Sequence, residues 1–284
     1  EIKDYLECPM KYKFRKLYGF SPAVPELFGY GLTTHTSINR LHQLYSDKAP
    51  TKEEAETVVE DVFHLKHAFP SHTPGNVGPY ERAKAASQKL VGDYANDYPA
   101  DFMQRRSLEQ NFEIKAGKAL ITGSIDLLLR EDEEGNIQEA KVIDFKSMDY
   151  PENQDTPYFW INQALQVQLY AHAAETVLGE NAKTGAVHLL KADNRDDLSN
   201  RVDIPIDNDA IYAAISNIEW AVNRILESEY PMRPSQHKCT SCDFVRICAK
   251  NKEEFTTKEI PCPIKIPEFN KIDEIRVRCF SDVD

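Results

Sequence analysis

The run KVIDFKS at residues 141–147 reads as a buried strand, yet it contains an acid at Asp144 and a base at Lys146. Successive side chains of a strand point to opposite faces of a sheet, so these two charges share one face. Burying an ion pair costs free energy that only good geometry and further hydrogen bonds offset. The run therefore predicts either a surface salt bridge at a solvated sheet edge or a charged pair held in the sheet for a chemical purpose.

A second acid approaches this pair if residues 119–130 and 138–147 form a hairpin whose turn centres on Gly135. Asp126 then lies nine residues before the turn and Asp144 nine residues after it. Such cross-strand neighbours have Cβ atoms about 5 Å apart. Like charges at that distance repel, and a bound divalent cation, which prefers oxygen ligands, removes the repulsion. The alternative is a hairpin edge at which both carboxylates face water.

The spacing of apolar residues changes along the chain from helical to alternating and back. Helical patterns cover residues 1–18, 29–46, 51–68, 79–97, 158–178 and 208–228, and strand patterns cover 107–115, 119–130, 138–147, 185–192 and 201–206. Thr51 and Glu54 have the spacing of a capping box. We expect one α/β domain over residues 1–284. Its parts are a mainly helical region, an α/β core and a Cys-rich tail, at residues 1–100, 107–228 and 231–284.

The net charge of −12 argues against a general nucleic-acid binder, because such proteins are usually basic. Residues 1–20, however, carry five basic and three acidic side chains, so the local field differs from that of the whole chain. No apolar run approaches the ~20 residues that a membrane span needs, and the first residues do not have the pattern of a secretory signal. We therefore expect a cytoplasmic protein without membrane contact. Because the first residue is Glu1 rather than Met, we also expect a module of a longer chain.

Three of the six cysteines have the spacing C-x2-C-x5-C, at Cys239, Cys242 and Cys248. Disulfides are not the default without a signal peptide, whereas C-x2-C is a metal-binding spacing. A tetrahedral site needs a fourth ligand, for which Cys262 is one candidate, while Cys279 has no evident role. The spacing alone leaves open whether zinc or an iron–sulfur cluster is bound.

Five motifs follow one another along the chain. They are YLECPMKYKF (5–14), GLTTH (31–35), GSID (123–126) with DFK (144–146), QVQLY (166–170) and the three-cysteine motif (239–248). In this order they resemble the PD-(D/E)XK nuclease superfamily and, within it, the RecB family, including AddB-type and CRISPR-associated nucleases with a cysteine cluster. GLTTH is similar to the family's Gly-x-x-x-His motif and QVQLY to its Gln-x-x-x-Tyr motif.

The resemblance implies a restriction-endonuclease-like core, in which a mixed central β-sheet is flanked by helices, with an N-terminal helical insertion and a Cys-rich C-terminal segment. It also implies a bound Mg²⁺ or Mn²⁺ ion. The implied metal ligands are His35, Asp126, Asp144 and the main-chain carbonyl of Phe145. Lys146 is then expected to orient or deprotonate the attacking water, and Gln166 and Tyr170 to position the strand.

Each of these residues also has a plainer interpretation. A single helical histidine such as His35 is more often a surface or core-edge residue. Gln166 and Tyr170, spaced i and i+4, form one face of any amphipathic helix. Glu113, on the strand before Asp126, is a lesser candidate for supporting the site.

For the cysteines, the resemblance makes Cys8 the fourth thiolate beside Cys239, Cys242 and Cys248. It implies a 4Fe-4S cluster that joins the two ends of the chain, with zinc as the alternative metal. Closing so long a loop should stabilise the fold by restricting the unfolded chain.

The function implied by the resemblance is a metal-dependent DNA nuclease that hydrolyses phosphodiester bonds and acts on single-stranded DNA ends. Nucleases of this kind commonly sit beside a helicase domain or subunit. We therefore expect an exonuclease module of a helicase–nuclease that acts in double-strand break repair and recombination. The alternatives are a stand-alone CRISPR-associated nuclease, a catalytically silent DNA-binding module with an iron–sulfur staple, and a redox or zinc-stapled scaffold without a nucleic-acid role.

Overall fold

The computed structural model describes residues 1–22, 24–73, 75, 77–131, 139–150, 156–192, 199–234, 239 and 242–248. The hairpin turn at Gly135 and the cysteines Cys262 and Cys279 lie outside these residues. None of the helices in the described part is both long enough and apolar enough to cross a membrane.

Five strands of the described chain form one mixed sheet in the order β1-β2-β3-β4-β5. They are β1 (Arg105–Ala116), β2 (Ala119–Glu131), β3 (Glu139–Lys146), β4 (Asn181–Leu189) and β5 (Arg201–Ile204). The first three strands are antiparallel neighbours, β3 and β4 run parallel, and β5 is antiparallel to β4. Helix α7 (Thr156–Thr176) makes the crossover that a parallel pair needs. The expected mixed sheet flanked by helices is confirmed.

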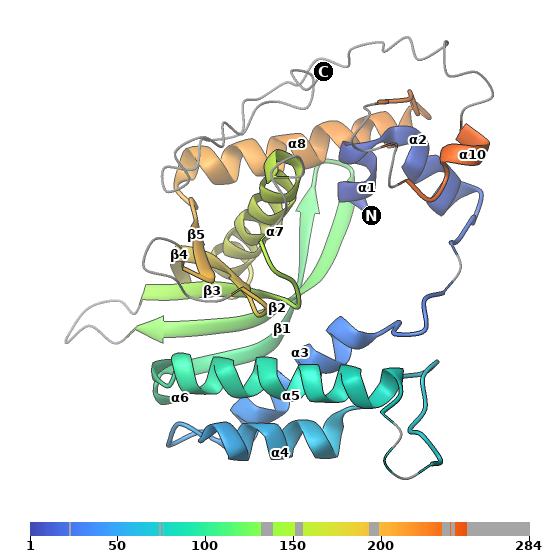
Figure 1. The fold of residues 1–284 in the computed structure, drawn as a ribbon. Helices are drawn as coiled ribbons and strands as arrows, with labels where there is room; N and C mark the ends of the chain where they lie inside the picture. Colours follow the sequence, from blue (N-terminus) through green and yellow to red (C-terminus); the bar gives the residue numbers. More distant parts are fainter. Residues whose placement is uncertain are drawn as a thin grey trace.

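Helices cover both faces of this sheet (Figure 1). α7 and α8 lie on one face and three N-terminal helices on the other. The ranges are α8 (Asn208–Leu226), α3 (Tyr30–Leu44), α4 (Lys52–Val62) and α5 (Pro79–Asp97). Strand alternation divides the core accordingly, because Leu128 and Val142 pack on the α7 side whereas Leu127 and Ile143 pack on the α5 side. Any side chain with the parity of Val142 therefore faces α7.

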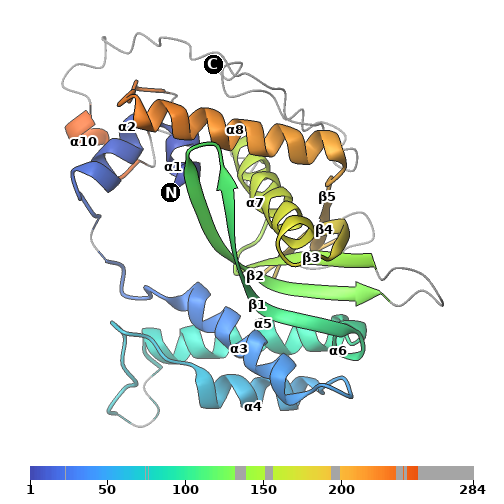
Figure 2. The ribbon, with the colours of Figure 1, turned by 180° about the vertical axis from the view of Figure 1, so that it is seen from behind.

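The hairpin between β1 and β2 rises beside α1 to reach α8 (Figure 2). At its turn the backbone N–H of Gly117 donates to Oε1 of Glu219 at 2.9 Å. This contact ties the far end of the hairpin to α8, so the strand that carries Asp126 is held at both ends.

The helix expected over residues 1–18 is interrupted at Cys8. Its pieces are α1 (Ile2–Glu7), α2 (Pro9–Tyr12) and a π-helical turn, η1 (Lys13–Leu17). Cys8 has an extended backbone (φ −158°, ψ 110°), because the residue before a proline is restricted away from the helical region. Pro9 then suits the first turn of the next helix. A proline that follows the cysteine thus sets the direction in which Cys8 leaves α1.

Tyr5 anchors α1 against α8. Its ring is fully buried and meets Tyr12, Trp220 and Tyr230 edge-on. Its hydroxyl donates to the carbonyl of Glu229 at 2.7 Å. The position of α1 is therefore fixed by packing rather than by the short helix itself.

Other element boundaries differ from expectation. The helix predicted over 51–68 ends at Val62, because Phe63 adopts an extended backbone (φ −63°, ψ 120°) and packs its ring edge-on against Tyr30 and Tyr80. A short helix, α6 (Ala100–Met103), has too few residues to show periodicity in the sequence. The strand predicted over 185–192 begins at Asn181 and ends at Leu189.

The capping box at the start of α4 is confirmed, and its loss should be measurable. The backbone N–H of Glu54 donates to Oγ1 of Thr51 at 3.2 Å, and the backbone N–H of Thr51 donates to Oε2 of Glu54 at 2.8 Å. We expect Thr51→Ala to lower the free energy of unfolding by about 1 kcal/mol in urea denaturation. Thr57→Ala, at an exposed position inside the same helix, is the control. An equal loss in both variants would contradict the capping role.

Candidate active site

Asp126 and Asp144 lie directly beyond the last pair of the β2–β3 ladder. The pairs run from Glu131↔Glu139 to Leu127↔Ile143, the register that a turn centred on Gly135 predicts. At the next position the ladder stops, and Oδ2 of Asp126 accepts the backbone N–H of Phe145 at 2.9 Å. The carboxylate of Asp126 thus replaces a main-chain acceptor and brings the two acidic positions to one place.

A buried polar network surrounds Asp144, which is only 1% exposed. Nζ of Lys146 lies 2.5 Å from Oδ2 of Asp144, and Nε2 of Gln166 donates to Oδ1 at 2.8 Å. Nε2 of Gln166 also donates to the hydroxyl of Tyr170 at 2.6 Å, and Nζ of Lys146 lies 3.4 Å from Oε1 of Gln166. Asp144 and Lys146 have the parity of Val142 and so face α7, which supplies the other two residues. Four of the expected site residues therefore meet.

Burial makes the negative charge of Asp144 in this network costly. Burial raises the pKa of Asp144, and the nearby carboxylate of Asp126 adds to this, while Lys146 acts in the opposite direction. Burial and the charge of Asp144 raise the pKa of Tyr170, so its hydroxyl stays neutral at physiological pH. The site therefore holds a carboxylate whose negative charge is destabilised and a phenol that can donate or accept a hydrogen bond.

His35 reaches the same place from the opposite layer. Its Nδ1 lies 3.4 Å from Oδ2 of Asp126, and its ring meets that of Phe145 edge-on. One turn earlier, a Cβ at Gly31 would lie 4.0 Å from Oγ of Ser147, so this face of α3 runs along the end of β3. Burial lowers the pKa of His35, but the contact with Asp126 outweighs it and the net shift is upward. His35 is thus placed beside one of the two acids.

The donor set suits a divalent cation in its chemistry, since carboxylate oxygens are ligands for Mg²⁺ and Mn²⁺, and an imidazole suits a transition metal. Within the described residues, however, no group of three or more His, Cys, Asp or Glu side chains is placed to share one metal ion. The expected ligands instead form separate contacts, with Asp126 held by His35 and Asp144 held by Lys146 and Gln166. A bound ion would have to draw these contacts together.

The four cysteines named in the sequence analysis line one small pocket of about 40 Å³. They are Cys8, Cys239, Cys242 and Cys248, and none of them forms a disulfide. Two contacts hold the tail segment against the N-terminus: Arg233 donates to the carbonyl of Leu6 at 3.1 Å, and Arg15 pairs with Asp243 at 3.0 Å. The pocket is thus built from the two ends of the described chain.

Two thiols of this pocket, those of Cys242 and Cys248, are difficult to ionise without a metal. Burial and the neighbouring cysteines raise the pKa of Cys248 to about 11, and burial also raises that of Cys242. Thiolate is the form that binds metal. A cation in the pocket would offset this cost, and thiolates suit zinc or an iron–sulfur cluster in their chemistry, but within the described residues the four cysteines are not placed to share one ion.

Two charged residues at the site carry no signal in the sequence. Nζ of Lys3, on α1, donates to Oε1 of Gln166, 163 residues away. Glu109 opposes Asp126 between the pairs Leu108↔Leu127 and Gln110↔Ile125, and it has a left-handed backbone with φ of 45°. Both depend on long-range packing or on an irregularity in a strand, which local patterns do not reveal. Glu113, the lesser candidate, is exposed and pairs with Thr122.

Two comparisons with known proteins give matches. A family model described as "PD-(D/E)XK nuclease superfamily" matches residues 1–249. Among solved structures, the one titled "Crystal structure of SSO0001" is similar, with 16% sequence identity, a TM-score of 0.35, and coverage of 84% of this chain and 93% of that chain. No curated protein sequence matches.

Proposed function

The chain belongs to the PD-(D/E)XK nuclease superfamily, and on this premise we propose that it is a Mg²⁺- or Mn²⁺-dependent deoxyribonuclease. The observation that supports the proposal most is the meeting of Lys146, Gln166 and Tyr170 at the buried carboxylate of Asp144. An ion pair with only a structural role would not need neutral hydrogen-bonding side chains, such as Gln166 and Tyr170, next to a second carboxylate, that of Asp126.

The roles proposed for these residues follow from their positions. Asp126, Asp144, His35 and the carbonyl of Phe145 would hold the divalent ion. When bound, the ion supplies charge relief for the phosphate and an acidified water. Lys146, beside Asp144, would orient the attacking water and balance the negative charge that develops during attack. Gln166 aligns the amine of Lys146 with the carboxylate of Asp144. The neutral hydroxyl of Tyr170 would contact the DNA strand.

We propose further that the four cysteines hold a 4Fe-4S cluster, with zinc as the alternative. The supporting observation is the shared pocket of Cys8, between α1 and α2, with three cysteines of the tail. Such a cluster would join α1 to the tail and so keep the N-terminal segment in place.

The metal in this pocket can be tested by its stoichiometry. Anaerobically purified protein should absorb near 400 nm and contain about four irons per chain if a cluster of that type is present, and about one zinc without that absorbance if zinc is bound. Cys8→Ser should remove the metal and lower the midpoint of thermal unfolding. Cys262→Ser should change neither, and loss of metal in that variant alone would assign the fourth ligand to Cys262.

The biological setting remains a proposal on the same premise: an exonuclease module linked to a helicase in double-strand break repair. A stand-alone CRISPR-associated nuclease is the alternative within the class, and a silent DNA-binding module is the alternative outside it. The proposed ligand positions His35, Asp126 and Asp144 are all occupied by residues that can bind metal, which favours an active enzyme.

A nuclease assay distinguishes an active nuclease from a silent DNA-binding module. Linear and circular single-stranded DNA and linear duplex are each incubated in EDTA, Mg²⁺ and Mn²⁺. We expect degradation of linear single strands in Mn²⁺ or Mg²⁺ and none in EDTA; sparing of the circular strand would support an exonuclease. Binding of DNA without cleavage under any metal condition would leave the silent module and reject the enzyme.

A further inference from the structure

Lys3 is a second lysine at the catalytic network. Its Nζ donates to Oε1 of Gln166, and Nζ of Lys146 lies 3.4 Å from the same oxygen. Two ammonium groups therefore converge on one neutral amide. The two cations repel each other, and the carboxylate of Asp144, 2.5 Å from Nζ of Lys146, offsets part of this repulsion. An anion beside Lys3 would offset more of it.

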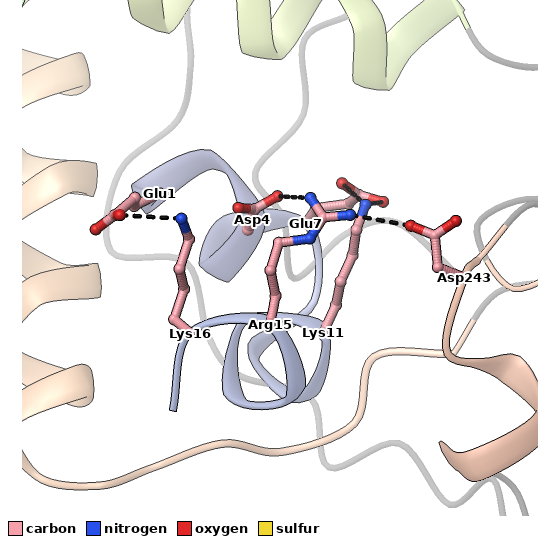
Figure 3. Close-up of polar contacts among 7 residues, drawn as sticks. All are labelled: Glu1, Asp4, Glu7, Lys11, Arg15, Lys16 and Asp243. Carbon is pink, nitrogen blue, oxygen red and sulfur yellow. Dashed lines mark hydrogen bonds and ion pairs between the residues drawn. The ribbon is translucent and has the colours of Figure 1, made fainter. Parts of the chain in front are cut away.

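The other cations of the N-terminal segment are already engaged. Figure 3 shows Lys16 paired with Glu1, Lys11 with Glu7, and Arg15 with Asp4 and Asp243. The distances are 2.9, 2.8, 3.1 and 3.0 Å in that order. Lys13 lies over the rings of Tyr18 and Tyr230. Among the described residues Lys3 makes no ion pair with a carboxylate within 4 Å, so its charge is available to a ligand.

Solvent and substrate can reach Lys3 through a cleft. A cleft of about 740 Å³ is lined by Lys3, Gln166 and Tyr170 together with residues of the β1–β2 hairpin and of α8. Gly123 lies in its wall, where a Cβ would come within 2.6 Å of the Phe112 ring. Ligand clefts typically measure about 300–1,000 Å³, so this one admits nucleotides. Of the two aromatic side chains in its lining, Phe112 is only 5% exposed and forms an apolar wall, whereas Tyr12 is partly exposed and is the ring on which a base would stack.

The position of Lys3 is fixed before any ligand binds. Tyr5 and Leu6, two and three residues further along α1, are fully buried. Burial and the charge of Lys146 lower the pKa of Lys3 to about 8, against the opposing effect of Asp144. A phosphate would relieve the repulsion from Lys146 without any movement of α1.

We propose that Lys3 is a phosphate-binding residue of this nuclease, and that it holds a single strand whose bases lie in the cleft beside Gln166 and Tyr170. The inference rests on the proposed function and adds to it the residue and the cleft that select a single strand. Duplex DNA does not expose base faces, so stacking in the cleft requires an unpaired strand.

The experiment compares Lys3→Met and Lys3→Gln with Lys183→Met, which removes the same charge from an exposed position on β4. Affinity for a short fluorescent oligothymidine is measured at pH 7 in EDTA over a range of salt concentrations. The values of kcat and KM are measured in Mn²⁺. We expect both Lys3 variants to weaken binding about tenfold and to reduce the slope of log K against log salt by about 0.7, as for the loss of one phosphate contact. KM should rise, and Lys183→Met should resemble the wild type.

Three results would overturn the proposal. An unchanged salt slope with a lower kcat would mean that Lys3 only braces Gln166. If the Lys3 variants change binding no more than Lys183→Met does, Lys3 has no role in binding. The proposal also fails if the wild-type protein shows no detectable binding. If the wild type binds but cuts under no condition, the nuclease function fails, while the salt slope in EDTA still decides the role of Lys3.

Discussion

Replacement of Asp144 by asparagine should lower kcat for metal-dependent cleavage about a thousandfold and leave the fold intact. Asparagine keeps the shape of the side chain and an oxygen that can accept from Gln166, but it lacks the charge that faces Lys146. Because burial and Asp126 raise the pKa of Asp144, the negative charge at this position disfavours the folded protein when no metal is bound. The variant should therefore unfold at the same or a higher temperature than the wild type in EDTA.

The measurement pairs cleavage rates with Mn²⁺ titration. Asp144→Asn should weaken Mn²⁺ binding, whereas Lys146→Met should lose comparable activity and still bind Mn²⁺, because it removes an amine and no ligand. Asp203→Asn, an acid on β5 that pairs with Lys141 at 3.8 Å, is the matched control and should keep full activity. Retained activity in Asp144→Asn would contradict the site. A fall in thermal stability that accounts for the loss of activity would show that Asp144 serves the fold instead.

The local part of this site could be predicted from the sequence because it follows from fixed periods. The two-residue period of a strand puts Asp144 and Lys146 on one face, and the 3.6-residue period of a helix puts Gln166 beside Tyr170. Symmetry of the hairpin about Gly135 gives the register of β2 and β3. Each of these is a relation within one element or one hairpin. The structure confirms all three relations, while the chemical roles of the residues stay predictions.

The parts that could not be predicted depend on packing between distant elements. The contact of Lys3 with Gln166 exists because Tyr5 fixes α1 against α8, and no pattern within residues 1–18 encodes that docking. The break at Cys8 can be predicted, since the following proline restricts the backbone of Cys8 away from the helical region. The helical spacing of the apolar residues around it nevertheless favours one continuous helix. Local rules predict the elements, whereas side chains that join elements need the fold.

A second buried network, on the opposite face of the sheet from Asp144, joins the helical layer to the edge strand. Asp101 of α6 receives two hydrogen bonds from Arg201 of β5, at 3.0 and 2.6 Å, and a third from the hydroxyl of Tyr94 at 2.9 Å. Nε of Arg201 donates to Nδ1 of His188 at 3.2 Å, and its guanidinium lies 3.8 Å from the centre of the Tyr98 ring. Burial and Arg201 lower the pKa of His188, which therefore stays neutral and accepts this bond. Every polar group of Arg201 named here has a partner, so the pair is satisfied as long as both residues are present.

Arg201→Met should therefore lower the free energy of unfolding by about 3–5 kcal/mol, because it leaves the Asp101 carboxylate buried without its cation. Lys48→Met removes an equal charge from the exposed pair with Glu54, at 3.1 Å, and should cost less than about 1 kcal/mol. The double variant Asp101→Asn/Arg201→Met should be more stable than Arg201→Met alone, since asparagine removes the unpaired charge and still accepts from Tyr94. Urea denaturation of the four proteins gives the comparison. If the double variant is no more stable than the single one, the penalty arises from lost packing of Arg201 on Tyr98 rather than from the buried charge of Asp101.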